Sequence, residues 1–399
     1  MASKSHTGRA IVSSDMLSKG GWKMQDLTLR PIADNELIID MVATGICHTD
    51  VIFGDQEDGQ PGCFYPRVMG HEGACPVSLY TRRRCSGYVR EVGSKVTVAK
   101  PGDPVLLSFA YCNGCHSCKD GHPAFCDKFN EINFYGGKDY ILSSSGGDPS
   151  KPDISGGFFG HSSFASVSIV NEVSVVNVKD SVTKKEDLQL LAPFGCGIQT
   201  GSGTVVNIAK ASQQDIVAVT GLGGVGLSAI MAAKISGCRM IIGIDRIASR
   251  LELAKTLGAT HTINTAELPE GKSIVDAVKE AAEGSGPSVS IDTTGLPALT
   301  RAAVEWTRNR GKICQVGTSP MDAKLDIPIF MFMISGKQFI GTVEGDSVPS
   351  EYVPKMIQWW RDGKFPVEKL AKFYKAEDYE TALHDMHSGE IVKPILLWN

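Results

Sequence analysis

The chain lacks an excess of positive charge: 40 lysine and arginine residues stand against 44 aspartate and glutamate residues, for a net charge of -4 at pH 7. Nucleic acids and anionic membranes attract proteins through basic surface patches, so we expect neither as a partner. The first residues, Met-Ala-Ser-Lys-Ser-His, also lack the apolar core of a signal peptide. We therefore expect no export and a cytoplasmic location.

Uninterrupted apolar runs are also scarce. Two stretches, Leu188 to Ala209 and Ile216 to Ala233, carry no charge over nearly the length of a membrane span, but each contains four glycines. The second is better explained as a strand, a turn and a helix, so we expect no transmembrane segment. With 42% hydrophobic and 21% charged residues over 399 positions, the sequence is typical of a globular protein with two domains of ordinary size.

Cysteine is present in quantity, with 11 residues. In a chain without a signal peptide, cysteines indicate metal ligands and free thiols before disulfides. Three segments place such groups beside other reactive side chains: Cys47-His48-Thr49-Asp50, Gly70-His71-Glu72-Gly73 and Gly195-Cys196-Gly197. A single cysteine is more often part of a core, but two thiolates and one imidazole with an open fourth position form a ligand set of catalytic zinc.

A second group of cysteines has a different spacing. Cys112, Cys115, Cys118 and Cys126 lie in a loop rich in glycine and polar residues. Four thiolates at this spacing predict a closed tetrahedral zinc site, and the alternative is four free thiols that cluster by chance. Because a closed site has no position for a substrate, we expect this zinc to stabilise the fold and to take no part in chemistry.

The second half of the chain contains a nucleotide-binding pattern. An apolar run, Ile216–Thr220, is followed by Gly221, Gly223 and Gly226 in a G-x-G-x-x-G arrangement and then by a helical run. These glycines permit a tight turn, close approach of a pyrophosphate and packing of the helix on the strand. The helix N-terminus then faces the phosphates.

The next apolar run ends in Asp245. Its carboxylate would accept hydrogen bonds from the adenosine ribose and would repel a 2′-phosphate, so NAD is favoured over NADP. Arg246 and Arg250 could offset part of that repulsion.

The remaining pattern predicts two kinds of fold in succession. Up to about residue 107 the chain shows short β runs separated by turns, whereas after Ile216 apolar strands alternate with helices, as in a doubly wound parallel sheet. We expect a loop over 143–157 and a β run from Phe158 to Val176. We also expect a helix that begins with a capping box over Ser249–Glu252 and ends at Gly258.

Together, these segments resemble those of the zinc-dependent medium-chain alcohol dehydrogenases over nearly the whole chain. The resemblance implies an α/β fold with a GroES-like β-rich catalytic domain over residues 1–187, completed by 341–399, and a Rossmann NAD-binding domain over 188–340. It also implies two zinc ions per chain. The implied ligands are Cys47, His71 and Cys196 for the catalytic zinc and Cys112, Cys115, Cys118 and Cys126 for the structural zinc.

The resemblance implies further roles around the metal and the cofactor. Thr49 would hand on the alcohol proton, Asp50 would orient His71, and Glu72 would assist ligand exchange at the zinc. The residues with implied contacts to the cofactor are His48, Arg250 and Lys393. The residues implied to line the substrate cleft are Phe158, Phe159 and Ser108.

The details look most like the benzyl or aryl-alcohol branch of this family. Ile52 takes the place of a histidine that many relatives use to pass the proton to solvent, so the relay either ends at the cofactor ribose and water or uses His48. We expect a homodimer or homotetramer that interconverts an aromatic or allylic primary alcohol and its aldehyde with NAD. Fungal relatives act in secondary metabolism, patulin synthesis among them, which is an analogy for the pathway.

One segment departs from the family, because about a dozen residues, Cys75–Ser86, are inserted directly after the His71 segment. Its three arginines and two cysteines suggest an anion site or an extra thiol, and the simpler explanations are a surface loop or translated non-coding sequence. Two alternatives for the function follow. One is a glutathione-dependent formaldehyde or polyol dehydrogenase of the same fold, and the other is an NAD-binding protein that the insertion has inactivated.

Overall fold

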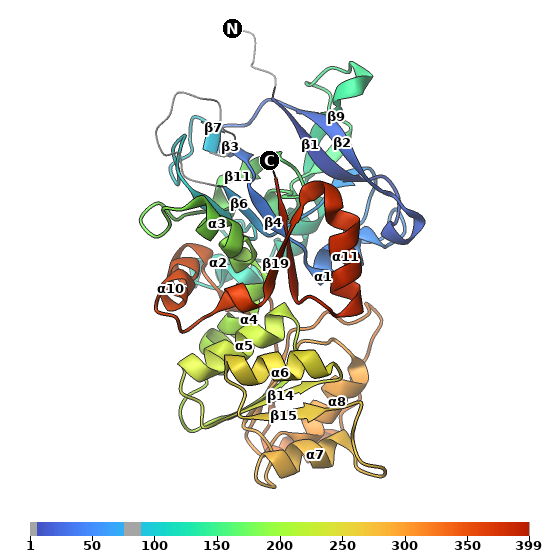
Figure 1. Ribbon diagram of the computed structural model, residues 1–399, viewed down its shortest axis with the longest axis vertical. Coiled ribbons are helices and arrows are strands. Elements are labelled where there is room, and N and C mark those ends of the chain that lie inside the picture. Colours follow the sequence, from blue (N-terminus) through green and yellow to red (C-terminus); the bar gives the residue numbers. More distant parts are fainter. Residues whose placement is uncertain (1–5, 76–88, 399) are drawn as a thin grey trace. The chain divides into compact units, whose positions relative to one another are not determined.

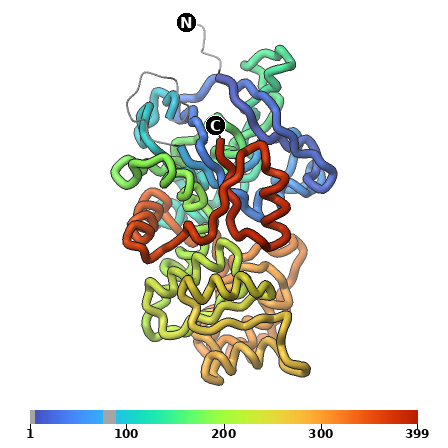
Figure 2. Tube along the Cα trace, in the orientation of Figure 1, coloured from blue at the N-terminus to red at the C-terminus, as the bar shows by residue number. Residues whose placement is uncertain are grey.

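The structure, a computed structural model, describes residues 6–75 and 89–398 (Figures 1 and 2). The described residues form two compact units. The first contains the chain up to Cys196 together with Val348–Gln358 and the segment from Val367 onward, and the second contains Gly197–Ser347 and Trp359–Pro366. The chain thus passes from one unit to the other after Cys196, whereas the domain limits inferred from the resemblance stay predictions.

The first unit consists mainly of β structure. Its strands are β1 (Thr7–Ser13), β2 (Trp22–Leu29), β3 (Glu36–Asp40), β4 (Ala43–Gly45), β5 (Arg67–Val68), β6 (Gly73–Cys75), β7 (Val89–Val92), β8 (Val105–Leu107), β9 (Gly137–Leu142), β10 (Ile154–Gly156), β11 (Val167–Asn171), β12 (Val175–Asn177), β19 (Ala371–Lys375) and β20 (Lys393–Leu397). They form a closed barrel, β1-β2-β9-β10-β5, a three-stranded sheet, β11-β3-β7, and a six-stranded sheet, β12-β8-β6-β4-β20-β19.

The C-terminal segment completes this unit. Strand β20 pairs antiparallel with β4, which lies more than three hundred residues earlier in the chain, and Figure 2 shows the red trace running beside the blue one. The helices of the unit are α1 (His48–Gly54), α2 (His116–Lys119), α3 (Lys185–Leu191) and α11 (Tyr379–Ser388). Helix α10 (Pro349–Arg361) begins in the first unit and ends in the second.

The second unit is a six-stranded parallel sheet with the strand order β15-β14-β13-β16-β17-β18. Its strands are β13 (Ile216–Thr220), β14 (Met240–Asp245), β15 (His261–Asn264), β16 (Val289–Asp292), β17 (Lys312–Gln315) and β18 (Gln338–Gly341). Its helices are α4 (Gly197–Gly203), α5 (Gly224–Ile235), α6 (Ala248–Leu257), α7 (Ile274–Ala281), α8 (Pro297–Trp306) and α9 (Ile329–Ser335). The central strands β13, β14 and β16 are almost entirely buried, as is typical of a parallel sheet with both faces covered.

Helices cover the two faces of this sheet (Figure 1). Ile242 of β14, Val278 of α7 and Trp306 of α8 belong to one buried cluster, so α7 and α8 pack on the same face. Helix α6 lies on the other side of β14 and β15 in Figure 1. This doubly wound parallel arrangement confirms the predicted fold class.

The predicted β run from Phe158 to Val176 is wrong. Phe158–Gly160 form a 3-10 turn in which Phe159 has a φ of 53°, and the strands in the run are confined to Val167–Asn171 and the start of β12 at Val175. Gly157 and Gly160 flank the turn with φ values of 69° and 76°, a backbone region that glycine enters without steric cost. The predicted loop over 143–157 also contains β10, which closes the barrel.

The predicted capping box of the Ser249 helix is also wrong. Helix α6 already begins at Ala248, and its N-cap residue, Ile247, has no capping side chain. The carboxylate of Asp245 instead accepts hydrogen bonds from the backbone N–H groups of Arg246 and Ile247, at 2.7 and 2.9 Å. The predicted end of the helix at Gly258 is confirmed.

The inserted segment Cys75–Ser86 lies outside the described residues except for Cys75, which is buried at the end of β6. No helix in the described ranges is long and apolar enough to cross a membrane.

Candidate metal centre and cofactor site

The first unit contains a cluster of potential metal ligands. One ligand atom from each of four residues lies within 4.8 Å of the others: Cys47, His71, Glu72 and Cys196. Cys47 follows β4 and the His71-Glu72 pair precedes β6, and these two strands are antiparallel neighbours. The pairing of β4 with β6 therefore brings the first two predicted zinc segments together.

The third zinc segment reaches the cluster through a close backbone contact. Cys196 follows the 3-10 turn Ala192–Gly195, and the buried hydroxyl of Ser108 donates a hydrogen bond to the carbonyl of Gly195 at 2.7 Å. A Cβ atom at Gly195 would lie 1.7 Å from the carbonyl oxygen of Leu107, so only glycine permits this approach. The place of Ser108 in a substrate pocket stays a prediction.

His71 is oriented for metal binding. Its Nδ1 lies 2.8 Å from Oδ1 of Asp50, and both groups are fully buried. Asp50 is itself held by backbone donors, because it accepts hydrogen bonds from Gly70 N at 3.1 Å and Cys47 N at 3.0 Å. The other imidazole nitrogen, Nε2, is buried and has no hydrogen-bond partner in the described part of the chain. A carboxylate on one nitrogen and a free second nitrogen fit a zinc-ligating histidine.

The thiols and the imidazole of the cluster influence one another strongly. The adjacent Cys196, with help from His71, lowers the pKa of Cys47 well below its ordinary value against the effect of burial. For His71, burial favours the neutral form, but Asp50 and the Cys47 thiolate raise its pKa well above the ordinary value. The Cys47 thiol thus loses its proton easily, whereas the His71 imidazole retains one. Binding of a divalent cation would displace that proton.

Glu72 forms a buried ion pair that the sequence did not indicate. Nζ of Lys393 lies 2.9 and 3.0 Å from the two carboxylate oxygens of Glu72 and 3.3 Å from the carbonyl of Ile46. Burial raises the pKa of Glu72 and Lys393 opposes that rise. A Cβ atom at Gly45 would lie 2.0 Å from the Glu72 carboxylate, so this glycine makes room for it. A contact of Lys393 with a cofactor pyrophosphate stays a prediction.

The remaining predicted catalytic residues lie on α1, directly after Cys47. Thr49 is half-buried and His48 is exposed. Ile52, one turn after Thr49, is 37% exposed. Residues three positions apart share one side of a helix, so an apolar side chain, and not a histidine, lies on the same side of α1 as Thr49. The roles of Thr49 and His48 in proton transfer stay predictions.

Aromatic rings surround the buried side of His71. The ring of Phe159 stacks on the imidazole with centroids 4.5 Å apart at an interplanar angle of 24°, and Phe158 meets it edge-on at 5.7 Å and 80°. Sequence reasoning missed two more members of this cluster, Phe53 of α1 and Phe134, whose rings stack at 4.5 Å. Their spacing in the chain gives no signal, because Phe53 belongs to α1 and Phe134 to a separate helical turn, Glu131–Tyr135.

The four-cysteine loop forms a second compact cluster. The sulfur atoms of Cys112, Cys115, Cys118 and Cys126 all lie within 4.8 Å of one another. Backbone N–H groups of Gly114 and Cys115 lower the pKa of Cys112 to about 6, whereas burial raises that of Cys118 to about 12. Such crowded thiols cannot all ionise without a cation, so the donor set fits a closed zinc site.

The glycine-rich turn of the second unit fits a dinucleotide. Gly221 has a φ of 85°, and a Cβ atom at Gly226 would lie 1.8 Å from the carbonyl oxygen of Gly221. At Gly223, in contrast, a Cβ atom would meet nothing within 4 Å, which leaves space for a phosphate at the start of α5. Asp245 accepts a hydrogen bond from Leu222 N at 2.7 Å, so its carboxylate lies beside the turn.

Arg250, on α6, adds to this fit. Its Nε is buried and has no hydrogen-bond partner among the residues the structure describes. An unpaired buried donor near Asp245 suits an anionic or hydroxyl group of a ligand. The contact of Arg250 with the cofactor ribose stays a prediction.

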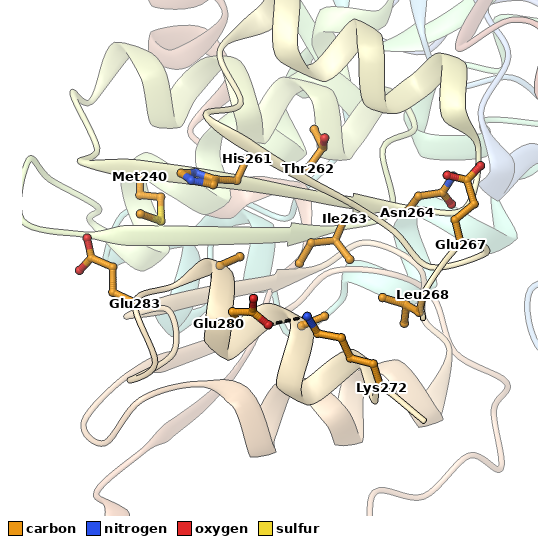
Figure 3. A pocket seen from close by; sticks show the side chains of 12 residues that line it. Met240, His261, Thr262, Ile263, Asn264, Glu267, Leu268, Lys272, Glu280 and Glu283 are labelled. Carbon is orange, nitrogen blue, oxygen red and sulfur yellow. Dashed lines mark hydrogen bonds and ion pairs between the residues drawn. The ribbon is translucent and has the colours of Figure 1, made fainter. Parts of the chain in front are cut away.

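A hollow of about 660 Å³ lies elsewhere in the second unit, between β15 and α7, and contains none of the predicted site residues (Figure 3). Two of its carboxylates form ion pairs: Glu280 with Lys272, which Figure 3 draws as a dashed line, and Glu283 with Arg239. We assign the hollow no function.

Comparison with known proteins supports the same interpretation of both units. Residues 33–180 match the alcohol dehydrogenase GroES-like domain and residues 224–362 match the zinc-binding dehydrogenase family. Geraniol dehydrogenase of Castellaniella defragrans is 35% identical over 364 residues, 91% of this chain and 91% of that protein. Class-3 alcohol dehydrogenase of Caenorhabditis elegans is 30% identical over 384 residues, 95% of this chain and 94% of that protein.

A solved structure agrees with these sequence relatives. The crystal structure of benzyl alcohol dehydrogenase from Acinetobacter calcoaceticus superposes with a TM-score of 0.85 at 34% identity, covering 99% of this chain and 100% of that one. Agreement in sequence and fold over nearly the full length excludes a match confined to one domain. The chain therefore belongs to the zinc-binding medium-chain alcohol dehydrogenases, NAD(P)-dependent oxidoreductases in which a GroES-like domain is joined to a Rossmann domain.

Proposed function

We propose that the protein interconverts an aromatic or allylic primary alcohol and its aldehyde, with NAD as the preferred cofactor. The observation that carries this proposal is the cluster of phenyl rings beside His71, in which Phe158 and Phe159 are both buried. Aromatic walls favour an apolar substrate with a planar π system by burial and ring contacts. Two relatives are named for alcohols of this kind, geraniol and benzyl alcohol.

The residues at the metal centre would have separate roles in the reaction. Cys47, His71 and Cys196 would hold the zinc, which when bound acts as a Lewis acid that lowers the pKa of a coordinated hydroxyl. Asp50 fixes the tautomer of His71 through the 2.8 Å contact. The Thr49 hydroxyl would take the alcohol proton and pass it on. With Ile52 beside it, that proton would leave through the cofactor ribose and water, or through His48.

The cofactor preference follows from Asp245. Its carboxylate lies at the glycine-rich turn, where it would accept hydrogen bonds from a ribose and repel a 2′-phosphate. Arg250 supplies a donor for the same ribose. Lys393 and His48 would contribute to binding of the pyrophosphate. We expect kcat/KM to be higher with NAD than with NADP.

A substrate assay tests the proposal. Purified protein would be assayed with benzyl alcohol, an allylic alcohol, ethanol, sorbitol and S-(hydroxymethyl)glutathione in the presence of NAD. We expect the highest kcat/KM for benzyl or allylic alcohol, because ethanol has no planar group to pack against the aromatic rings. A preference for ethanol, or for the glutathione adduct, would contradict it. A role in secondary metabolism rests on the analogy with fungal relatives alone.

We also propose that the protein is a homodimer that associates through the second unit. Five large apolar side chains of α9 are highly exposed: Ile329 at 84%, Phe330 at 66%, Met331 at 59%, Met333 at 64% and Ile334 at 56%. Helix α9 precedes β18, an edge strand of the parallel sheet. An exposed apolar patch and an open strand edge each promote aggregation when they are left uncovered. Their combination at α9 and β18 supports association with a second copy, which would cover both.

A further inference from the structure

We propose that Phe159 is a positioning residue that fixes the plane of the His71 imidazole for metal binding. The inference rests on the proposed role of Cys47, His71 and Cys196 as zinc ligands. Phe159 would not touch the metal or the reacting atoms. It would act through the ring on which it stacks.

The geometry around His71 calls for such a contact. The Asp50 carboxylate holds Nδ1 at 2.8 Å, but a single hydrogen bond leaves the imidazole free to tilt about that contact. A tilt would move Nε2, on the opposite side of the ring, relative to the two sulfur atoms. The nearly parallel ring of Phe159, at 4.5 Å and 24°, opposes this tilt over the whole imidazole face. The edge-on ring of Phe158, at 5.7 Å, touches the imidazole less extensively.

The residue that makes this contact, Phe159, has a strained backbone. Its φ of 53° and ψ of 33° lie in the left-handed region, which is unfavourable for a bulky residue. Strained residues of this kind persist where surrounding contacts impose them, and they cluster at functional sites. Here the hydroxyl of Ser174 donates a hydrogen bond to the Phe159 carbonyl at 3.2 Å. A core phenyl ring without a special role could be supplied from ordinary backbone.

The turn that carries Phe159 is bonded to the residues that precede His71. The Ser162 hydroxyl donates to Val68 O at 2.7 Å, and the backbone N–H groups of Ser163 and Phe164 donate to Gly70 O and Met69 O at 2.8 and 2.9 Å. Three consecutive residues before His71 are thus fixed to the segment that follows Phe159. These hydrogen bonds between residues 68–70 and 162–164 therefore fix the position of the Phe159 ring relative to the His71 imidazole.

Plain core packing is the alternative explanation. Phe159 also contacts the rings of Phe129 and Phe134, at 6.2 and 5.6 Å. Loss of its ring would lower the stability of the unit in either case. A stability measurement alone therefore cannot separate the two explanations, and the test needs a readout from the metal.

The experiment compares F159L, F159Y and F129L as full-length proteins. F159Y keeps the stacking ring, and F129L removes a neighbouring ring that has no contact with His71 among those described. Zinc per chain is measured after equilibration with EDTA over a range of concentrations. Cobalt exchanged into the site reports the coordination geometry through its visible absorption bands.

We expect F159L to lose one of its two zinc ions at an EDTA concentration about tenfold lower than the wild type, the usual effect of losing a group that orients a ligand. Its cobalt bands should shift. F159Y should match the wild type, and F129L should match it in zinc retention despite a lower melting temperature. The inference is overturned if F159L retains zinc as the wild type does, or if F129L loses zinc equally easily.

A further variant, C196S, separates this inference from the assignment of the zinc ligands. It should lose one zinc ion regardless of the state of Phe159. If C196S retains both zinc ions, the ligand assignment itself fails and the positioning role fails with it. If C196S loses one and F159L does not, only the positioning role fails.

Discussion

The buried pair of Lys393 and Glu72 gives the sharpest prediction about the first unit. The substitution K393M keeps an unbranched side chain of similar length but removes the ammonium group that lies 2.9 and 3.0 Å from the Glu72 carboxylate. Glu72 is 0% exposed, so water cannot replace the lost partner. Breaking a buried ion pair by removing one member costs about 3–5 kcal/mol. We expect the free energy of unfolding of K393M to fall by about that amount.

The double variant E72Q/K393M tests whether this loss comes from the unpaired charge. The single variant E72Q removes the charge that neutralises the buried ammonium of Lys393, which keeps only neutral acceptors from this pair of contacts: the new amide oxygen and the Ile46 carbonyl at 3.3 Å. The double variant leaves neither charge. Its destabilisation should therefore be smaller than the sum of the two single effects by about 2–3 kcal/mol, as for groups in direct contact.

The assay is urea unfolding of the full-length protein at a fixed zinc concentration, because a bound metal adds its own stabilisation. The matched control is K375M, which removes an exposed lysine of the neighbouring strand β19 and should change stability by less than about 0.5 kcal/mol. The reasoning is refuted if K393M lies within about 1 kcal/mol of the wild type. It is also refuted if the two single effects simply add.

Three further predictions concern other parts of the chain. Burial, together with Glu36, raises the pKa of Asp139 from 3.8 to about 6 although Arg30 lies 2.8 Å away. The contribution of Asp139 to the free energy of unfolding is therefore greatest below pH 3.8 and is lost as the pH rises through 6. Unfolding of D139N followed against pH should therefore gain about 3 kcal/mol on the wild type between pH 4 and pH 7, and parallel curves would contradict this. C115S should lose the structural zinc and lower the melting temperature while the other metal is retained, as measured by zinc analysis and calorimetry; an unchanged zinc content would count against the closed site. The double variant I329D/M333D should convert a dimer into a monomer in analytical ultracentrifugation without unfolding the sheet, and a persistent dimer would place the interface elsewhere.

Most of the predictions about the site came from the residue types and spacing within short segments. The cysteine spacing from Cys112 to Cys126 and the glycine spacing from Gly221 to Gly226 are local, because each predicted site is formed by one loop whose own residues shape it. Candidate ligands on three separate segments could be named because thiolate and imidazole chemistry limits the choice. The parallel sheet could be predicted because apolar strands and helices alternate along the chain.

Local pattern failed where the backbone departs from its usual conformation. The run that begins at Phe158 has the composition of a strand, yet Phe159 adopts a φ of 53° between two glycines and Ser162 one of 57°. Helix α6 lacks the capping box suggested by Ser249 and Glu252, because the carboxylate of Asp245 already binds the backbone at its start. In both cases the conformation of the backbone or a polar contact with it outweighs the preference that the side-chain pattern suggests.

By itself the sequence determined which chemical groups were available and which short loops would gather them, since spacing within a loop constrains its own geometry. Only the tertiary structure decided which distant groups meet. Lys393 reaches Glu72 across 321 positions of sequence, the Ser108 hydroxyl binds the residue before Cys196, and Phe159 lies flat on His71. No periodicity encodes such pairs, because they arise where strands from different segments share one sheet and bury polar groups that must then find partners.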